Sequence, residues 1–469
     1  MSQKDFNNKQ AIFDLVSRFE DMCQNGKVSF LDEQSYHMLI NYFQEEYLID
    51  RALDVVDYAI AQHNFSSEFY IRKAELLIDY QREELAMGAL DKAEILAPNE
   101  LKIPLMRAEA LASLELYDDA LQILEGLKHF QDTEDLSKVF LTESLVYEAM
   151  EEYQRMYYAL QASLKENIKN KEALERMWIC VELSKKFRES IKLHEHILNE
   201  DPYSYLAWYN LGAAKSYYGH YEEAIEAYEY AFLINDNFEL AYKDCAEICF
   251  EIQNYHKALS CYQEVLEHFE PDYYLFQRIG QCYQKLSSFA IAKTFFEKAA
   301  QLDPFNDEVF FHLGECYYKE ENWAKAIRYF KHAIRIEDKR EEYFSSLADA
   351  YFHLGNYDKA GPLYREATEI APEQSGYWIK YARFLVQMNM VEQALEVIDE
   401  GEEYTGDTNL MYYRIGCLFL LNKRQDAFML LSNALDEDFY QHNSLFDILP
   451  VLQEDTEVQA IIATYQPLH

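Results

Sequence analysis

The chain has 469 residues, more than one compact core usually holds, so it forms either several domains or one repetitive array. Its 83 acidic and 43 basic residues give a formal net charge of −40, which repels a polyanion and excludes a general nucleic-acid binder. Aromatic residues make up 15% of the chain, whereas it has only 13 glycines and 9 prolines, a composition typical of long helices packed by large side chains.

Residues 1–32 predict an N-terminal capping helix. Between residues 5 and 24, apolar side chains such as Ile12, Val16 and Phe19 fall on one helical face, which can cover the exposed flank of the element that follows. The start lacks the apolar run of a signal peptide, and no stretch reaches the roughly 18 apolar residues that a membrane span needs. We therefore expect a cytoplasmic protein without membrane contact.

Alanine then recurs every 34 residues. The returns are Ala224, Ala258, Ala292, Ala326, Ala360 and Ala394. The register extends backward with one step of 36 residues and forward with one step of 33, and it predicts twelve units over residues 33–442. These units start near residues 33, 67, 101, 137, 171, 205, 239, 273, 307, 341, 375 and 409.

Each unit reads as a hairpin of two helices. Helical apolar spacing occurs twice per unit, separated by a short polar turn such as Gly219-His220. A second small position, exemplified by Gly314, lets the two backbones approach. A large residue four positions after the period alanine, such as Phe330, is expected to fill the gap toward the next hairpin. Because one hairpin cannot bury both faces, the units must stack.

The repeat pattern resembles the tetratricopeptide repeat family. The residues that carry this resemblance are Trp208-Tyr209-Asn210-Leu211-Gly212 with Tyr221, Ala224, Tyr228 and Ala231, and again Phe310, Leu313, Gly314, Tyr317, Ala326, Phe330 and Ala333. It covers about residues 33–442 and implies an all-α, right-handed superhelical α-solenoid of about twelve hairpins. Met156 and Pro362 depart from the pattern. Pro362 follows Gly361 near the start of its helix, so we expect a slight bend there and not a break.

Residues 443–469 predict capping helices at the other end, because Phe446, Leu449 and Ile462 recur at helical spacing.

Motifs of catalysis are absent from the sequence. It has no Gly-rich phosphate loop, no HExxH and no GxSxG. His194 and His196 are two residues apart and point to different sides of a helix, so they do not form a metal pair. Cys245 and Cys249 lie four apart but fall on packing positions, and we expect all eight cysteines to be reduced, mostly buried thiols. The sequence therefore predicts no enzyme, no cofactor and no bound metal.

The resemblance implies that the first helix of each hairpin lines a concave groove, where family members usually hold partner peptides. The partner-binding candidates are therefore the positions of these helices that are expected to face solvent: Tyr209, Asn210, Tyr217, Lys243, Phe250, Tyr274, Gln277, Arg278, Gln281, Lys285, Phe311, His312, Tyr318, Lys319 and Phe352. Exposed aromatic and basic residues are the types that anchor protein interfaces.

Charge favours an acidic partner. Residues 273–340 hold 11 basic and 9 acidic side chains, a balance of +2, so the rest of the chain carries −42. An acidic segment of a partner, or an acidic region of another copy, can dock there with electrostatic help. Four of the basic residues, Lys325, Arg328, Lys331 and Arg335, follow the second helix of their unit in a pattern typical of a solvated face.

One family subclass holds the acidic tails of chaperones with a clamp of basic and amide side chains. Tyr209, Asp244 and Tyr274 stand where that clamp needs such groups, so we do not expect chaperone-tail binding.

Three functional hypotheses remain at this point. The leading one is a non-catalytic scaffold or adaptor that binds a partner protein or peptide in its concave groove. The alternative is a self-assembling structural protein, since a polarised array can associate with copies of itself. An enzyme or an RNA-binding helical repeat is less favoured, because the motifs are missing and the charge is unsuitable.

Overall fold

A computed structural model of the chain describes residues 3–25, 30–129 and 132–466. Within these residues every regular element is a helix, which confirms the predicted all-α solenoid of helical hairpins. The chain divides into two compact units, Met1–Ile248 (unit 1) and Cys249–His469 (unit 2). Parts of the predicted capping segments, residues 1–2, 26–29 and 467–469, lie outside the described residues.

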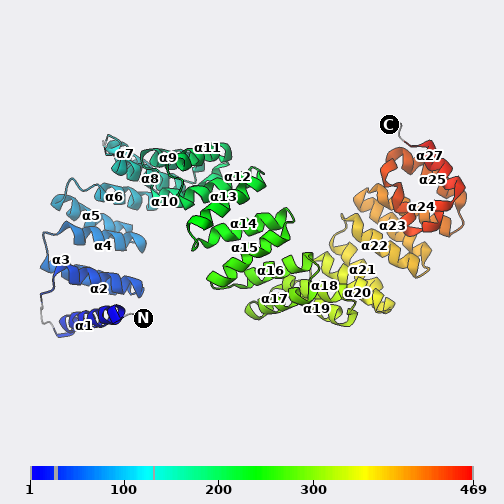
Figure 1. Cartoon of the computed structure of the whole chain (residues 1–469), viewed down its shortest axis with the longest axis horizontal. Coiled ribbons are helices and arrows are strands. Elements are labelled where there is room, and N and C mark those ends of the chain that lie inside the picture. The colour runs from blue at the N-terminus through cyan, green and yellow to red at the C-terminus, as the bar shows by residue number, and fades with distance from the viewer. Residues whose placement is uncertain (1–2, 26–29, 130–131, 467–469) are drawn as a thin grey trace. The chain divides into compact units, whose positions relative to one another are not determined.

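Antiparallel helices pack in consecutive pairs along both units, as Figure 1 shows. Unit 1 contains α1 (Gln3–Asn25) and the pairs α2 (Glu33–Glu45) and α3 (Ile49–Gln62), α4 (Ser67–Asp79) and α5 (Glu83–Leu96), α6 (Lys102–Ser113) and α7 (Tyr117–Leu127), α8 (Thr133–Ala149) and α9 (Tyr153–Glu166), α10 (Lys171–Ser184) and α11 (Phe187–Glu200), and α12 (Tyr205–Tyr217) and α13 (Tyr221–Ile234). Helix α14 (Glu239–Glu251) begins in unit 1 and ends in unit 2.

Unit 2 continues in the same way. It contains α15 (Tyr255–His268), the pairs α16 (Tyr273–Lys285) and α17 (Phe289–Leu302), α18 (Asp307–Lys319) and α19 (Trp323–Ile336), α20 (Glu341–His353) and α21 (Tyr357–Ile370), α22 (Ser375–Gln387) and α23 (Val391–Thr405), and α24 (Thr408–Leu420) and α25 (Arg424–Glu437), then the short helices η1 (Phe439–Asn443), α26 (Ser444–Ile448), η2 (Pro450–Glu454) and α27 (Thr456–Thr464). Helix α21 runs without interruption through Pro362.

Small residues of the first helix are covered by aromatic rings of the second. A Cβ atom added at Gly314 would lie 2.5 Å from the ring of Phe330, and one added at Gly280 would lie 2.7 Å from the ring of Phe296. Such distances leave no room for a methyl group. Rings at this register position also reach the next hairpin, since Phe296 stacks on His312 at a centroid distance of 5.4 Å and Tyr364 lies 5.2 Å from Phe384.

The turn inside each hairpin holds one residue in the left-handed conformation. These residues are Tyr47, Gln81, Glu115, Glu151, Lys185, Gly219, Gln253, Ser287, Glu321, Gly355, Asn389 and Asn422, with φ between 57° and 85°. They recur at 34-residue steps apart from one step of 36 and one of 33. Only two are glycine, so the hairpin geometry imposes this conformation on residues that do not prefer it.

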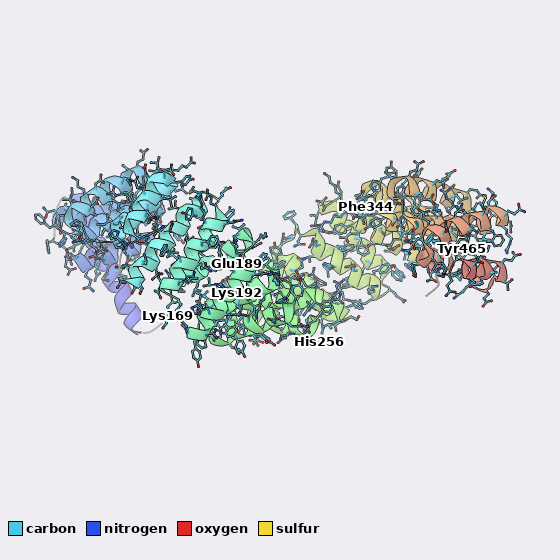
Figure 2. The ribbon with its side chains drawn as sticks, turned by 90° about the horizontal axis from the view of Figure 1, so that it is seen from above. Lys169, Glu189, Lys192, His256, Phe344 and Tyr465 are labelled. Carbon is cyan, nitrogen blue, oxygen red and sulfur yellow. The ribbon has the colours of Figure 1, made fainter. Side chains whose placement is uncertain are left out.

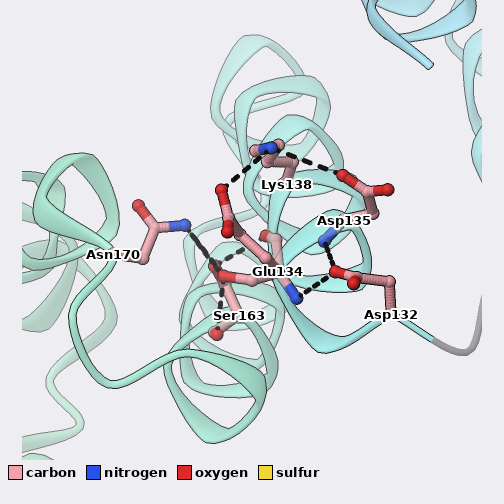
Figure 3. Close-up of polar contacts among 7 residues, drawn as sticks. Asp132, Glu134, Asp135, Lys138, Ser163 and Asn170 are labelled. Atoms are coloured by element: carbon pink, nitrogen blue, oxygen red, sulfur yellow. Dashed lines mark hydrogen bonds and ion pairs between the residues drawn. The ribbon is translucent and has the colours of Figure 1, made fainter. Parts of the chain in front are cut away.

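Polar side chains fix individual helices where apolar packing is insufficient. Asp132 caps α8 and accepts hydrogen bonds from the amides of Glu134 and Asp135 at 2.9 and 3.1 Å (Figure 3). The buried hydroxyls of Ser137 and Ser163 lie 3.0 Å apart, and Asn170 of the next turn donates to both. These bonds link α8, α9 and the start of α10.

Both ends of the array are covered by additional helices. At the N-terminal end, the ring of Phe19 on α1 is fully buried against Tyr58 at a centroid distance of 5.4 Å. At the C-terminal end, Leu445 and Ile448 of α26 are buried, and Ile448 packs closely onto Gly416 of α24.

Candidate partner-binding groove

The first helices of neighbouring hairpins in unit 2 line a pocket of about 440 Å³. It lies between the end of α14, α16 and α18, with contributions from the turn after α16 and the start of α17. Its lining residues are Phe250, Arg278, Gln281, Gln284, Lys285, Ser287, Phe289, His312, Glu315 and Lys319. Asp272 and Asn306 cap α16 and α18 at their N-termini and so begin the two helices that position most of these side chains.

A chain of hydrogen bonds orients the pocket wall. Arg278 donates from Nη1 to Gln281 Oε1 at 2.9 Å, and Gln281 Nε2 lies 3.0 Å from His312 Nε2. His312 Nδ1 in turn lies 2.9 Å from Glu315 Oε2, which also accepts from Gln284 Nε2 at 3.0 Å. Because carboxylates only accept, His312 carries a proton on Nδ1 and accepts from Gln281 at Nε2. This assignment orients both amide groups of the wall.

Glu315 is a carboxylate in the pocket wall whose Oε2 is hydrogen-bonded to side chains of the wall itself. Burial raises the pKa of this carboxyl, but the hydrogen bond and electrostatic attraction from His312, the hydrogen bond from Gln284 and the charge of Lys285 together lower the net pKa. The carboxylate is therefore charged and satisfied from within the chain. Lys285 and Lys319 lie exposed at the rim, and neither forms an ion pair with an acidic side chain among the residues that the structure describes. They are the groups with charge to offer a ligand.

Arg278 stabilises the pocket wall from inside. Its guanidinium carbon lies 4.0 Å from the ring centroid of Phe250, and Nε donates to the hydroxyl of Tyr262 at 3.2 Å. Together with the bond to Gln281, these contacts hold the side chain in a half-buried position. Phe250 and Arg278 thus form a stacked pair that closes one side of the pocket.

A second pocket of about 310 Å³ lies farther along unit 2, between α18, α20 and α22. Tyr318 and Phe352 line it together with Asp349 and Lys380. Lys380 and Asp349 form an ion pair at 3.0 Å, and Arg383 is a second, exposed basic residue of the lining. Burial raises the pKa of Tyr318 to about 12, and the phenol stays protonated at neutral pH.

Four candidates predicted to face solvent are buried, and this prediction was wrong. Gln277 and Phe311 occupy the same register position as Tyr209, 68 and 102 residues later, and all three pack against the hairpin that follows. Tyr209 donates its hydroxyl to Asp244 Oδ2 at 2.7 Å.

Phe311 stacks on Tyr343 at a centroid distance of 4.6 Å, and Gln277 bonds to Asn306 and Glu308. The next position, Asn210, is buried because its Nδ2 donates to the carbonyl of Leu174 at 2.8 Å.

The remaining candidates lie outside the two pockets. In unit 1, Tyr217 is 48% exposed and stacks on Phe187, and Lys243 forms an ion pair with Glu239 at 2.6 Å. In unit 2, Tyr274 is 44% exposed. The structure therefore brings six of the predicted residues into the first pocket, and these are Phe250, Arg278, Gln281, Lys285, His312 and Lys319.

Four residues of this pocket, Gln284, Ser287, Phe289 and Glu315, are not among the predicted candidates. Gln284 lies three residues after Gln281 on α16, and Glu315 three after His312 on α18, so helical spacing could have found both. Ser287 and Phe289 belong to the turn and to the start of the second helix, whereas the candidates all come from first helices. Phe289 gives the pocket an additional apolar wall.

Metal sites, membrane spans and reactive thiols are features of other functional classes. No group of three or more His, Cys, Asp or Glu side chains in residues 3–25, 30–129 and 132–466 could hold a metal ion. No helix in that part of the chain is long and apolar enough to cross a membrane. Seven of the eight cysteines are buried, and burial raises the pKa of the Cys180, Cys316 and Cys417 thiols to about 12.

Family models of the tetratricopeptide repeat match residues 273–306, 307–373 and 351–413, which include α16, α18, α20 and α22 of the two pockets but not α14. Residues 273–413 of this chain are tetratricopeptide repeats. The family and the stack of helical hairpins indicate a protein-interaction scaffold. A comparison with curated proteins finds no match.

Solved structures of other tetratricopeptide repeat proteins are similar at low identity. YrrB is 19% identical over 39% of this chain and 95% of its own, with a TM-score of 0.35. The C-terminal part of a repeat protein from Cytophaga hutchinsonii is 16% identical over 54% of this chain and 98% of its own, with a TM-score of 0.42. Yeast Tom70 is 15% identical over 92% of this chain and 100% of its own, with a TM-score of 0.35. These similarities are too low to transfer a function.

Proposed function

We propose that this tetratricopeptide repeat protein is a non-catalytic, cytoplasmic scaffold that binds an acidic peptide segment of a partner protein in the pocket between α14, α16 and α18. The observation that carries the proposal is the combination of two unpaired rim lysines with a fixed polar wall and aromatic sides in one pocket. A peptide carboxylate can pair with Lys285 or Lys319, and a neighbouring side chain can pack against Phe250 or Phe289.

The wall adds specificity to this charge attraction. Since Gln281 and Gln284 are oriented by Arg278, His312 and Glu315, their amides are held in place before the peptide arrives. Preorganised groups lose little conformational entropy on binding. Lys285 and Lys319 are exposed, and replacing them leaves the hydrogen bonds of the wall intact.

Affinity capture from native cytosol with the whole chain as bait, followed by titration of the recovered partner, tests this proposal. The test variant carries Lys285→Glu with Lys319→Glu. The control carries Lys169→Glu with Lys192→Glu, which changes the net charge equally at two exposed lysines of unit 1 (Figure 2). We expect the test variant to bind the partner at least about tenfold more weakly, because each change replaces attraction with repulsion, while the control binds like wild type.

Circular dichroism of all three proteins verifies that the helical content is unchanged. Equal affinity of wild type and the test variant for the recovered partner would refute the pocket as its binding site. Binding that weakens equally in the test variant and the control would mean that net charge, and not the pocket, determines the interaction.

A further inference from the structure

Helix α19 exposes a row of basic side chains in a strongly acidic protein. It contains four Lys and Arg residues and no Asp or Glu. Lys325, Arg328, Lys331 and Arg335 are all exposed, at spacings that place them along one face of the helix. None of them forms an ion pair with an acidic side chain of the described residues.

The contacts that these side chains do make leave their charge uncompensated. The ammonium of Lys325 lies 4.9 Å from the ring centroid of Tyr317, and that of Lys331 lies 5.4 Å from the ring centroid of Tyr351. A cation over a ring is attracted to it but keeps its full charge. Nearby His332 responds to this environment, since burial and then the charges of Arg335 and Arg328 lower its pKa.

Helix α23, two hairpins farther along unit 2, has the opposite charge at the same register. It contains six acidic residues and no basic one. A step of 68 residues, twice the repeat length, takes Arg328 to Glu396, and the same step takes Lys331 to Asp399 and Arg335 to Glu403. All three acidic side chains are exposed. Only Asp399 among them forms an ion pair, with Arg414.

Helix α21 lies between the two in the order of hairpins (Figure 1) and is mixed in charge. At the equivalent register positions it has Arg365 and Glu369, whose charged groups lie 3.9 Å apart. The second helices of unit 2 thus change from basic at α19, through balanced at α21, to acidic at α23. A face with this order is complementary to itself after rotation by 180°.

We propose that this face is the interface of a two-fold dimer, in which α19 of one copy lies against α23 of a second copy. In that arrangement each copy contributes one basic and one acidic helix, and α21 meets its own counterpart at the centre. Two-fold dimers are the commonest symmetric assemblies, and they require a self-complementary patch of this kind. The dimer interface is separate from the pocket proposed for partner binding, which is lined by first helices.

The net charge of −40 per copy does not prevent this association. At physiological ionic strength the screening length is about 8 Å, so charges far from the interface interact weakly across it. The opposed rows at the interface are within that distance of one another and determine orientation and specificity.

Sedimentation velocity of the whole chain at constant ionic strength tests the dimer. One variant carries Arg328→Glu with Lys331→Glu, which removes the net charge of α19 and places two acidic side chains opposite the acidic α23 of the second copy. A second variant carries Glu396→Lys with Glu403→Lys, which reduces the acidic charge of α23 and places two basic side chains opposite the basic α19 of the second copy. We expect wild type to form a dimer and each variant alone to dimerise at least about tenfold more weakly.

Mixing the two variants is the decisive experiment. In a mixed dimer the two introduced Glu side chains on α19 of the first variant meet the two introduced Lys side chains on α23 of the second, and the remaining pair has its wild-type charges. An equimolar mixture is therefore expected to recover a 1:1 dimer. The Lys169→Glu and Lys192→Glu variant changes the net charge as much as the first variant does and is expected to dimerise like wild type.

Several results would overturn the proposal. They are a wild-type chain that stays monomeric at every concentration reached, a first variant that dimerises as tightly as the control, a mixture that stays monomeric, and a wild-type assembly that keeps growing beyond two copies. The substituted side chains are exposed, and unchanged circular dichroism verifies that loss of the dimer is not loss of the fold.

Discussion

The contact between Gly314 and Phe330 makes a sharp prediction about stability. In Gly314→Ala, the new methyl group would lie 2.5 Å from the Phe330 ring, about 1 Å closer than carbon atoms usually approach. The ring cannot move freely, because Phe330 is only 1% exposed and packs against Phe311. Overpacking of this kind costs about 1–3 kcal/mol, and the better helix propensity of alanine offsets about 1 kcal/mol. We expect a net destabilisation of about 1 kcal/mol.

Gly88 provides a matched control within a helix. A Cβ at Gly88 on α5 meets no heavy atom within 4 Å, so Gly88→Ala gains helix propensity without a clash. We expect this substitution to stabilise its hairpin by about 0.5–1 kcal/mol. The same chemical change thus has opposite signs at the two sites, which separates packing from propensity.

Amide hydrogen exchange measured by mass spectrometry suits this comparison, because it reports the opening free energy of each hairpin and does not require two-state unfolding of the array. Phe330→Leu provides the second arm of a double-mutant cycle. The smaller side chain should relieve the clash, so its cost is expected to be lower in the Gly314→Ala background than in wild type. A stabilised α18–α19 hairpin in Gly314→Ala, or additive effects of the two changes, would refute the assigned contact.

Two further predictions concern buried polar groups in unit 1. Burial lowers the pKa of His194 from 6.5 to about 4, so the folded state binds fewer protons than the unfolded state. The free energy of unfolding is therefore highest above pH 6.5 and falls as the pH drops toward 4. Urea unfolding should show a loss of about 2 kcal/mol between pH 7 and pH 5 that is absent in His194→Leu; an equal pH dependence of the two proteins would contradict it. Tyr209→Phe should lower the stability by about 1–3 kcal/mol, because it removes the hydroxyl that donates a hydrogen bond to the largely buried Asp244. Hydrogen exchange of α12 and α14 measures this loss, and exchange unchanged from wild type would show that the bond contributes little.

The fold could be predicted from the sequence because the repeat is written directly into it. The alanine period and the paired helical patterns require stacked hairpins, whatever the surface residues are. The turns could be located, since the predicted turn Gly219-His220 contains the left-handed Gly219, but which residue of each turn adopts this conformation could not be predicted. Ten of the twelve left-handed turn residues are not glycine, so residue type does not mark the position, and the geometry of the two packed helices determines it.

The candidate site could be predicted in part. Lys285, His312 and Lys319 could be predicted because polar side chains on a first helix rarely point into the core. The error at Tyr209 and Phe311 has a physical cause: their register position borders the apolar face, and the following hairpin decides whether it is covered. An amphipathic side chain is compatible with either environment, so only the packed structure reveals the burial.

The charges on the second helices of unit 2 require an explanation that the fold itself does not give. Core positions of the repeat are constrained by contacts such as that between Gly314 and Phe330, whereas the exposed positions of α19 and α23 contact little and are free to vary. If they only kept the protein soluble, both signs would be interspersed on each helix, as they are on α21. On α19 all charged side chains are basic, and at matching register positions on α23 they are acidic. This separation gives the surface one basic and one acidic side. Because that surface and the peptide pocket are on different helices, the Lys285→Glu and Lys319→Glu variant should lose its partner and still form the dimer. A joint loss of both would mean that the dimer completes the pocket.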